Sequence, residues 1–364
     1  MSWIKKALFL LVGWSVLTII CVVLLELFFG SWLSKDPWEV TKGLNIIRNK
    51  QLTYATESLY GKDMASVIYS RDSNGLRGGC PKVADIDIVT IGGSTTDQRY
   101  VPDGKTYQDV LQTLLTNELA APVCVSNAGV DGHSTFGHLA SFDNWFPLIS
   151  NLKPKYFLFY VGINDAGFVQ EPRLGFDRKS RWGQIREKSA LFGLLRTVRN
   201  VIQSSSSGLY AQHNDTPASK RDYVAERTTE GVDALIKNNT EKFRVRFDKL
   251  LTQAKNYGAA PICVSQPHLF TADIDATQKG VDAVFHYKGK AYNGLDFNAS
   301  LLAINNTMMV SCMKAGGFFI DVRSKYFEVS DFYDHVHLGP SGARKLGTYL
   351  YDEFLKQGLL SRLN

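Results

Sequence analysis

The chain has 364 residues, of which 45% are hydrophobic and 21% charged, so it has enough apolar material for a sizeable globular core. Its net charge of +6 is modest, and no segment resembles a nucleic-acid-binding module, which excludes nucleic acid as a partner. The cysteine and histidine spacings match no metal motif, and we expect neither a metal nor a cofactor.

The first predicted element is a membrane anchor. Residues 7–25 carry no charge, and at ~1.5 Å per residue they form a helix roughly 28 Å long, which matches the hydrocarbon core of a bilayer. A cleaved signal peptide has a shorter apolar core and an A-x-A-like site, and neither is present. Because Lys5 and Lys6 precede the helix, we expect one pass through residues 7–29 with a cytoplasmic N-terminus and a periplasmic or extracellular body.

Basic residues after the anchor weaken this orientation, although long domains translocate largely regardless of charge: Lys35, Lys42, Arg48 and Lys50. We divide the chain into the anchor (1–34), a linker and lead-in segment (35–83) and one domain (84–364).

Short apolar runs alternate with helical stretches in this domain. The runs are Ile86–Ile91, Val123–Ser126, Tyr156–Val161, Pro261–Ser265 and Phe318–Val322. Apolar residues recur at helical spacing in 107–119, 243–254 and 343–354. The alternation predicts an α/β fold, namely a three-layer α/β/α sandwich around a five-stranded parallel sheet.

Two predicted insertions, at about 166–240 and 269–300, interrupt the alternation. The first holds a helical apolar stripe, a serine run (204–207), a polar stretch (213–221) and a basic cluster between 173 and 199. The stripe either packs on the domain or lies on a membrane; it comprises Leu191, Leu194, Leu195, Val198 and Ile202. The basic cluster is either a solvated surface or a contact for anionic lipid or glycan. The second insertion is a candidate substrate lid.

Four cysteines lie in the body, and their pairing stays open. They are Cys80, Cys124, Cys263 and Cys312, which allow three connectivities. Cys80 precedes the first strand and Cys124 lies in the second, so these two are candidates for proximity; buried free thiols are equally ordinary.

Four polar blocks hold the candidate site residues. They are Gly92–Thr95, Asn127–Ser134, Gly162–Asp165 and Asp334–Gly339. Open parallel sheets bind ligands outside the carboxyl ends of their strands, so we expect one crevice to collect all four blocks.

These residue types suit acyl transfer. A serine hydroxyl needs a base to take its proton, a histidine titrates in the right range, and a carboxylate holds the imidazole in one tautomer. We assign these roles to Ser94, His337 and Asp334. The oxyanion needs donors already in place, for which the candidates are the backbone N–H groups of Ser94 and Gly132 and the Asn164 amide.

With these blocks the sequence resembles the SGNH hydrolases, also called GDSL-type esterases and lipases. The four family blocks are matched in order by Ser94, Gly132, Asn164 and the pair Asp334 and His337. The resemblance covers roughly residues 84–357, outside the two insertions. The resemblance implies a flavodoxin-like sheet, the same triad and the same oxyanion donors. One departure is Gly93, where the family usually has aspartate. The Gly-Gly-Ser-Thr form is similar to membrane-anchored bacterial members linked to envelope glycans.

Other assignments compete with these. Asp331 is an alternative carboxylate and Gly129 an alternative oxyanion donor. An alternative for His335 and His337 is that they are ordinary loop histidines, while His133, His138 and His268 are structural or merely near the crevice. A phosphate-binding loop is disfavoured because no G-x-x-x-x-G-K-[ST] or G-x-G-x-x-G motif is present. The missing H-x-x-x-H and H-E-x-x-H patterns disfavour a metallohydrolase.

We therefore expect a membrane-anchored serine esterase or deacylase that acts on O-acyl groups of an envelope glycan or lipid. One alternative is an O-acyltransferase that modifies a cell-surface polysaccharide with the same triad and receives acyl groups from a membrane donor protein. A second is a non-catalytic envelope assembly or binding protein on the same fold.

Overall fold

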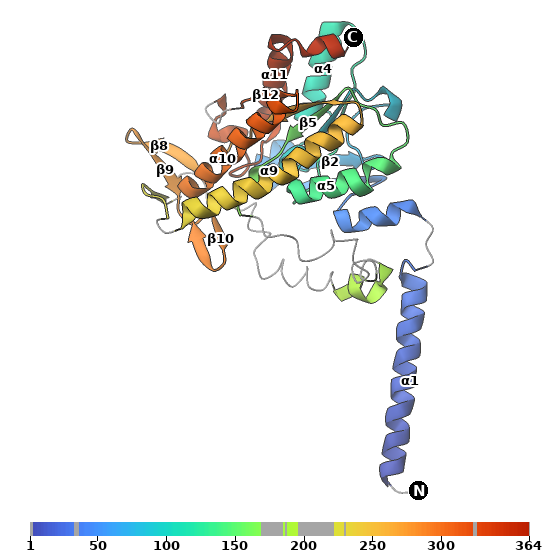
Figure 1. Ribbon diagram of the computed structural model, residues 1–364. Coiled ribbons are helices and arrows are strands. Elements are labelled where there is room, and N and C mark those ends of the chain that lie inside the picture. The colour runs from blue at the N-terminus through green and yellow to red at the C-terminus, as the bar shows by residue number, and fades with distance from the viewer. Residues whose placement is uncertain are drawn as a thin grey trace. The chain divides into compact units, whose positions relative to one another are not determined.

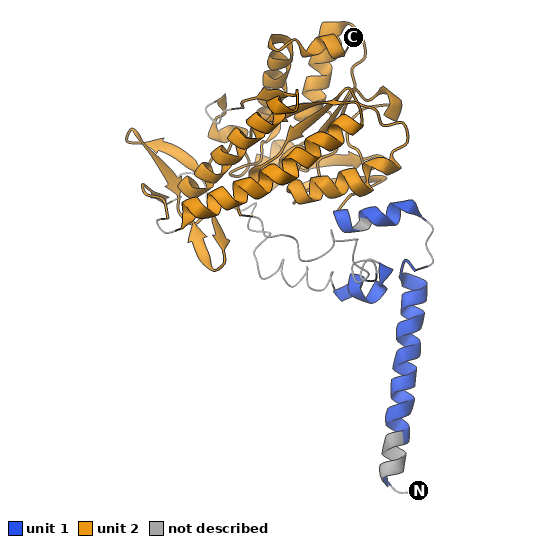
Figure 2. Ribbon diagram, viewed as in Figure 1, with its two compact units in different colours: residues 1–44, 172–212 blue, residues 45–171, 213–364 orange. Residues whose placement is uncertain are grey.

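The computed structural model describes residues 3–32, 36–168, 185, 188–195, 222–228, 231–322 and 326–363. The chain forms two compact units (Figure 2), one from residues 1–44 and 172–212 and the other from 45–171 and 213–364. Most of the predicted basic cluster, the serine run and the polar stretch before residue 222 lie outside the described residues.

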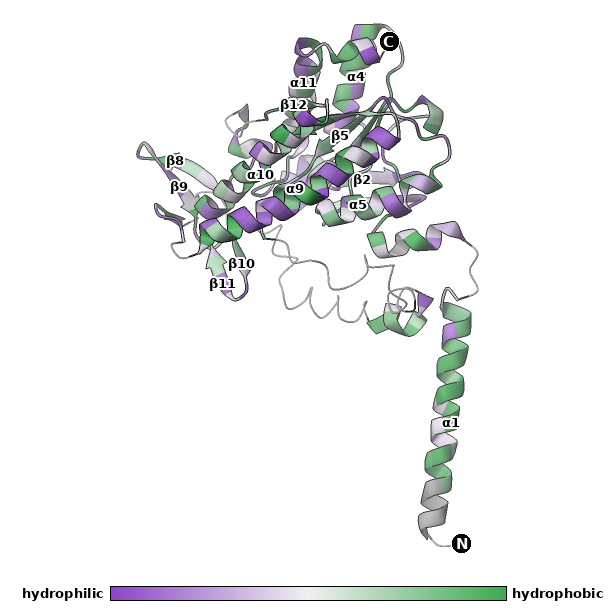
Figure 3. Ribbon diagram, in the orientation of Figure 1, coloured by the Kyte–Doolittle hydropathy of each residue, from purple (hydrophilic) through white to green (hydrophobic). Residues whose placement is uncertain are grey.

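Unit 1 contains α1 (Trp3–Phe29) and the 3₁₀ helix η1 (Pro37–Leu44). Within the described part of the chain, α1 is the one helix long and apolar enough to cross a membrane, over Phe9–Phe29. Figure 3 shows α1 coloured hydrophobic along most of its described length. Length and composition fit a membrane anchor or a signal sequence.

Unit 2 is built on a five-stranded sheet with the order β4-β3-β5-β7-β12. Figure 1 labels two of these strands, β5 and β12. The strands are β3 (Ile88–Gly92), β4 (Val125–Asn127), β5 (Tyr156–Tyr160), β7 (Ala260–Val264) and β12 (Phe318–Ile320). All four strand pairs are parallel. Taken in chain order, this is the 2-1-3-4-5 arrangement of flavodoxin-like sheets, so the predicted fold class is confirmed.

Helices cover both faces of the sheet because each central strand is apolar on both sides. On one face, Ile88 and Leu158 join a core with α4 (Tyr107–Leu119) and α11 (Pro340–Lys356). On the other face, Phe157 and Phe159 contact aromatic residues of α5 (Thr135–Asn144) and α9 (Val232–Asn256), beside α10 (Gly294–Lys314). Shorter 3₁₀ helices are η4 (Phe146–Leu148), η8 (Val329–Asp331) and η9 (Leu359–Arg362).

The segment before the sheet has structure of its own in unit 2. Strands β1 (Lys50–Ala55) and β2 (Ser66–Arg71) pair antiparallel, and α2 (Glu57–Tyr60) and η2 (Lys62–Met64) connect them. The inward face of β2 carries Val67, Tyr69 and Arg71, which are all buried. After β2, η3 (Val83–Asp85) leads into the central sheet.

The second predicted insertion is mainly β-structure. Strands β8 (Thr271–Ile274) and β9 (Thr277–Val281) form a hairpin, which β6 (Tyr223–Val224) extends to three strands. A second hairpin follows, from β10 (Phe285–Tyr287) and β11 (Lys290–Tyr292). Phe168 packs on Tyr292 in a small core separate from the main one.

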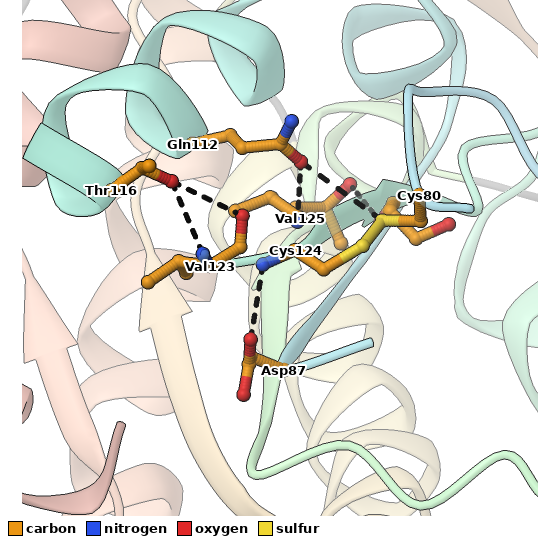
Figure 4. Close-up of a disulfide and its surroundings, with 9 residues drawn as sticks. Cys80, Asp87, Gln112, Thr116, Val123, Cys124 and Val125 are labelled. Atoms are coloured by element: carbon orange, nitrogen blue, oxygen red, sulfur yellow. Dashed lines mark hydrogen bonds between the residues drawn. A yellow bond between two sulfur atoms is a disulfide. The ribbon is translucent and has the colours of Figure 1, made fainter. Parts of the chain in front are cut away.

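Two disulfides link the sheet to neighbouring segments. Cys80 is bonded to Cys124 beside β4, and Cys263 of β7 is bonded to Cys312 of α10. Figure 4 shows the first bond beside α4, where Gln112 accepts a hydrogen bond from the Val125 N–H at 2.9 Å. Cys21, in α1, is the free cysteine.

The Cys263–Cys312 bond predicts a measurable stabilisation. It closes a loop of 49 residues, and a loop of this length corresponds to about 4 kcal/mol in the chain-entropy description. We expect Cys263→Ala/Cys312→Ala to lower the free energy of unfolding by about that amount in denaturant titrations, with Cys21→Ser as a neutral control. An unchanged unfolding midpoint in the double variant would contradict this expectation.

Candidate active site

The four polar blocks lie where the sheet topology brings them. Ser94 is the first residue of α3 (Ser94–Asp97), directly after β3. The second block forms the loop between β4 and α5, and Asn164 lies in α6 (Ile163–Ala166) after β5. The fourth block lies between η8 and α11, beyond β12. The parallel strands end at one edge of the sheet, so these segments meet there.

Ser94, His337 and Asp334 form a continuous hydrogen-bonded chain. His337 Nε2 lies 2.7 Å from Ser94 Oγ, and His337 Nδ1 lies 2.5 Å from Asp334 Oδ2. Because an ionised carboxylate only accepts hydrogen bonds, a proton lies on Nδ1, and in the tautomer that has no other ring proton Nε2 is the acceptor that faces the serine. The geometry joins the three residues that the sequence predicts as nucleophile, base and carboxylate.

The surroundings of Asp334 keep it ionised. Burial alone raises the pKa of this carboxyl, but His337 and the backbone N–H groups of Val336 and His337 outweigh it, and the net pKa is lowered. Both N–H groups donate to Oδ1, at 2.9 and 2.8 Å, which leaves Oδ2 for the imidazole. The competing Asp331 instead accepts from Lys345 at 2.7 Å and from the Glu328 N–H.

The predicted oxyanion donors are the N–H groups of Ser94 and Gly132 and the side-chain amide of Asn164. The Ser94 N–H is at the start of α3 and therefore has no acceptor within that helix. Asn164 Nδ2 donates to the His133 carbonyl at 2.8 Å, and this bond leaves the second amide hydrogen for a ligand. Gly132 is exposed with φ +76°, and a Cβ there would meet no atom within 4 Å. The competing Gly129 N–H already donates to Asn127 Oδ1 at 2.8 Å.

The space beside Gly93 is occupied by neighbouring atoms. A Cβ at Gly93 would lie 2.5 Å from Asn164 Nδ2 and 3.0 Å from the His133 carbonyl oxygen. The Asn164 amide therefore fills the space that a side chain at position 93 would need. Glycine at position 93 thus leaves room for a candidate oxyanion donor.

A row of tyrosines begins at the histidine. Tyr333 stacks on the His337 imidazole with the ring planes 3° apart and the centroids at 5.3 Å. Tyr100 packs edge-on against Tyr333, and Tyr54 of β1 packs edge-on against Tyr100. These three residues, which we call the tyrosine row, are all partly exposed.

Gln266 is a supporting residue that the sequence analysis did not assign. Its side chain accepts from the Ile163 N–H at 2.8 Å and donates to Thr95 Oγ1 at 2.7 Å. It therefore joins the turn that holds Asn164 to the helix that holds Ser94. Its place just after β7, at the same sheet edge, was the available signal.

A buried arginine also reaches the nucleophile segment from β2. Arg71 forms an ion pair with Asp97, at the end of α3, and donates to the carbonyls of Asn127 and Gly129 at 3.1 and 2.6 Å. Tyr69 donates to the same Asp97 carboxylate at 2.7 Å. These contacts connect the first and second blocks through residues outside the predicted domain.

Asp165 anchors the third block in the core. It accepts from the Thr135 hydroxyl at 2.6 Å and from Arg246 of α9 at 3.1 Å, with no exposed side-chain surface. Burial raises the pKa of Asp165, while Thr135 and Arg246 oppose that rise. The ion pair fixes α6, and with it Asn164, against α5 and α9.

Three other histidines, His138, His268 and His335, have structural surroundings. Burial lowers the pKa of His138 well below its usual value and that of His268 to about 4. His268 contacts Asn298 at 3.0 Å, and His335 stacks on Phe270. Among the described residues, no group of three or more His, Cys, Asp or Glu side chains is arranged to hold a metal ion.

Comparison with known proteins finds similarity in structure only. No protein-family model and no curated protein sequence matches the chain. Similar solved structures include LAE5, an alpha/beta hydrolase enzyme from the metagenome of Lake Arreo, Spain, with 14% identity and a TM-score of 0.41 over 76% of this chain and 95% of that one.

Two further similar structures come from named bacteria. One is a catalytic mutant of Axe2, an acetylxylan esterase from Geobacillus stearothermophilus, with 11% identity and a TM-score of 0.43 over 74% of this chain and 93% of that one. The other is a member of the lipolytic protein G-D-S-L family from Veillonella parvula, with 15% identity and a TM-score of 0.40 over 74% and 98%. Because these values are low, the chemistry is inferred from this chain's own residues.

The Asp165–Arg246 pair predicts a large effect on stability. Arg246→Met leaves a buried carboxylate without its cation, so we expect the free energy of unfolding to fall by about 3–5 kcal/mol in urea titrations. Arg244→Met, two residues away on the exposed face of α9, is the matched control and should change little. Arg246→Met with Asp165→Asn should recover part of the loss, because the uncompensated charge is gone. Equal effects of the two single substitutions would refute the role of the buried pair.

Proposed function

We propose that the protein is a serine-dependent carboxylic ester hydrolase that works through an acyl-enzyme. The observation that supports this proposal most strongly is the hydrogen-bonded chain from Ser94 through His337 to Asp334. A non-catalytic assembly or binding protein does not need these hydrogen-bonded side chains. A non-catalytic role on the same fold is therefore less well supported.

In the proposed mechanism, Ser94 Oγ attacks the carbonyl carbon of the ester while its proton moves to His337 Nε2. Asp334 stabilises the imidazolium that forms and holds its Nδ1 proton. The imidazolium then gives its proton to the alcohol oxygen as the bond from carbon to that oxygen breaks, which leaves the acyl group on Ser94. Water then attacks the acyl carbon and gives a proton to His337 Nε2. The bond from that carbon to Ser94 Oγ breaks, the imidazolium returns the proton to Oγ, and the acid leaves.

Three donors are proposed to stabilise the negative oxygen of both tetrahedral intermediates. They are the N–H groups of Ser94 and Gly132 and the side-chain amide of Asn164. Gln266 and the Asp165–Arg246 pair hold two of these donors in place before substrate binds, so little reorganisation accompanies the reaction.

We propose that α1 is a membrane anchor with a cytoplasmic N-terminus and that the body faces the periplasm or exterior. Both disulfides support this placement, because such bonds persist in oxidising compartments. The proposed substrates are therefore O-acyl groups of an envelope glycan or lipid.

The tyrosine row favours a sugar as the alcohol part of the ester. Tyrosine rings offer an apolar face to the C–H groups of a sugar ring and a hydroxyl to its polar edge. The row begins with Tyr333 on the catalytic imidazole and continues through Tyr100 to Tyr54, so it extends from the reacting atoms.

An O-acyltransferase is the second candidate. The triad is unchanged in this reaction, but a sugar hydroxyl takes the place of water in attacking the acyl-enzyme. The proposed anchor favours the acyltransferase, because α1 would hold the body near a membrane protein that donates acyl groups. Incubation with an aryl acetate and an oligosaccharide separates the two: acetylated oligosaccharide indicates transfer, and acetate alone indicates hydrolysis.

Reactivity of Ser94 tests the central proposal. We expect a fluorophosphonate probe to label the purified protein and an aryl acetate to be hydrolysed, and we expect Ser94→Ala to abolish labelling and to lower kcat by at least about 10³-fold. Ser361→Ala, a serine on the exposed surface of η9, should retain both activities. A folded protein that reacts with neither reagent would rule out the enzyme.

Tyr100→Ala tests the sugar contact separately. Aromatic contacts contribute about 0.5–1.5 kcal/mol, so kcat/KM for an acetylated oligosaccharide should fall by up to about tenfold, mainly through KM. Activity on a small aryl acetate should change far less, and Tyr326→Ala, an exposed tyrosine outside the row, should affect neither substrate. If both substrates lose activity equally through kcat, the row merely supports the histidine.

A further inference from the structure

Residues 188–195, although far along the chain, are bonded to the end of α1 within unit 1. Glu26 lies in the last turn of α1, and its carboxylate accepts from Ser189 Oγ at 2.5 Å, the Ala190 N–H at 3.0 Å and the Leu191 N–H at 3.1 Å. The Trp32 indole donates to the same carboxylate at 2.7 Å. The Lys188 carbonyl accepts from the Ser31 N–H at 2.8 Å, so backbone contacts add to those of the carboxylate.

These bonds cap a helical turn over residues 190–195. Ser189 Oγ accepts from the Phe192 N–H at 3.2 Å, as an N-cap residue does, and the Glu26 carboxylate takes two further N–H groups at the same end. A negative charge at the start of a helix is favourable because the N–H groups there point toward it. The turn is therefore fixed to the end of the proposed membrane span, 163 residues or more away in sequence.

The capped turn exposes apolar side chains. Leu191, Phe192, Leu194 and Leu195 are between 37% and 54% exposed, and Phe28 and Phe29 at the end of α1 are about 80% exposed. The sequence places basic residues on both sides of the turn, namely Arg186, Lys188, Arg196 and Arg199. Exposed leucines and phenylalanine flanked by basic residues are typical of a segment that lies in the interface of an anionic membrane.

We infer that residues 188–195 are a second membrane contact, which lies in the lipid interface beside α1 with its leucines and phenylalanine among the acyl chains. This inference rests on the proposal that α1 spans the bilayer. Because Phe9–Phe29 fills the hydrocarbon thickness, Glu26 lies near the boundary, where a carboxylate needs hydrogen-bond donors in place of water. The capped turn supplies three of them, and its apolar residues leave water at the same time.

Fluorescence in vesicles tests this inference on the full-length chain. Cys21→Ser removes the free cysteine, since the other four cysteines are disulfide-bonded, and Leu194→Cys then takes a single NBD label. The same label at Leu17→Cys, in α1, reports the span, and at Asn117→Cys, on the exposed face of α4, reports water. The proteins are reconstituted in vesicles of phosphatidylcholine and phosphatidylglycerol with or without doxyl-labelled lipid.

We expect doxyl lipid to quench the labels at positions 17 and 194 but not the label at 117. Shallow doxyl groups should act best at 194 and deep ones at 17. Glu26→Ala should reduce quenching at 194 and leave it unchanged at 17, because it removes the acceptor that holds the turn.

Each other result counts against the inference in a distinct way. Quenching at 17 without quenching at 194 overturns it while leaving the anchor intact. A label at 194 that is shielded from water but unaffected by doxyl lipid indicates a protein contact, from this chain or a second copy, and also overturns it. Quenching at neither position refutes the anchor itself, whereas none of these results bears on the esterase activity.

Discussion

The hydrogen bond between His337 and Ser94 joins residues 243 positions apart, and it depends on the parallel direction of the sheet. Parallel strands present all their carboxyl ends at one edge, so segments that are distant in sequence emerge side by side. The serine follows β3, the Asn164 amide follows β5, and Gln266 follows β7. Helices cover both faces of these strands and exclude water from them. The sheet edge is therefore held in place, and the hydrogen bonds of the proposed triad and of Gln266 are 2.5–2.8 Å long.

Buried polar groups, as well as apolar packing, hold together the segments at the sheet edge where the four blocks meet. Arg71 forms an ion pair with Asp97 and donates hydrogen bonds to carbonyls of the second block. Arg246 forms an ion pair with Asp165 and donates a hydrogen bond to Thr135. A buried charge is costly unless it is paired and hydrogen-bonded, and each of these is. Such pairs permit few alternative arrangements, which suits donors that must be aimed before the substrate arrives.

The sheet and the four blocks could be predicted because they have local signals: β-branched and aromatic runs, and glycine, serine and asparagine at strand ends. Strand limits differed by up to two residues, since hydrogen bonding rather than apolarity ends a strand. Arg71 carries no local signal, because its importance depends on distances across the fold, and the one signal for Gln266 was its place just after a predicted strand. Among the cysteines, likewise, only Cys80 and Cys124 were singled out for proximity, and the structure pairs Cys263 with Cys312 as well.

The order of the blocks along the chain has a consequence for biogenesis. Ser94, the proposed nucleophile, follows the first strand of the central sheet, whereas His337, its proposed base, comes after all five strands of that sheet. During synthesis, Ser94 is therefore made well before its proposed base. A polypeptide that stops before His337 lacks the imidazole that the proposed reaction needs.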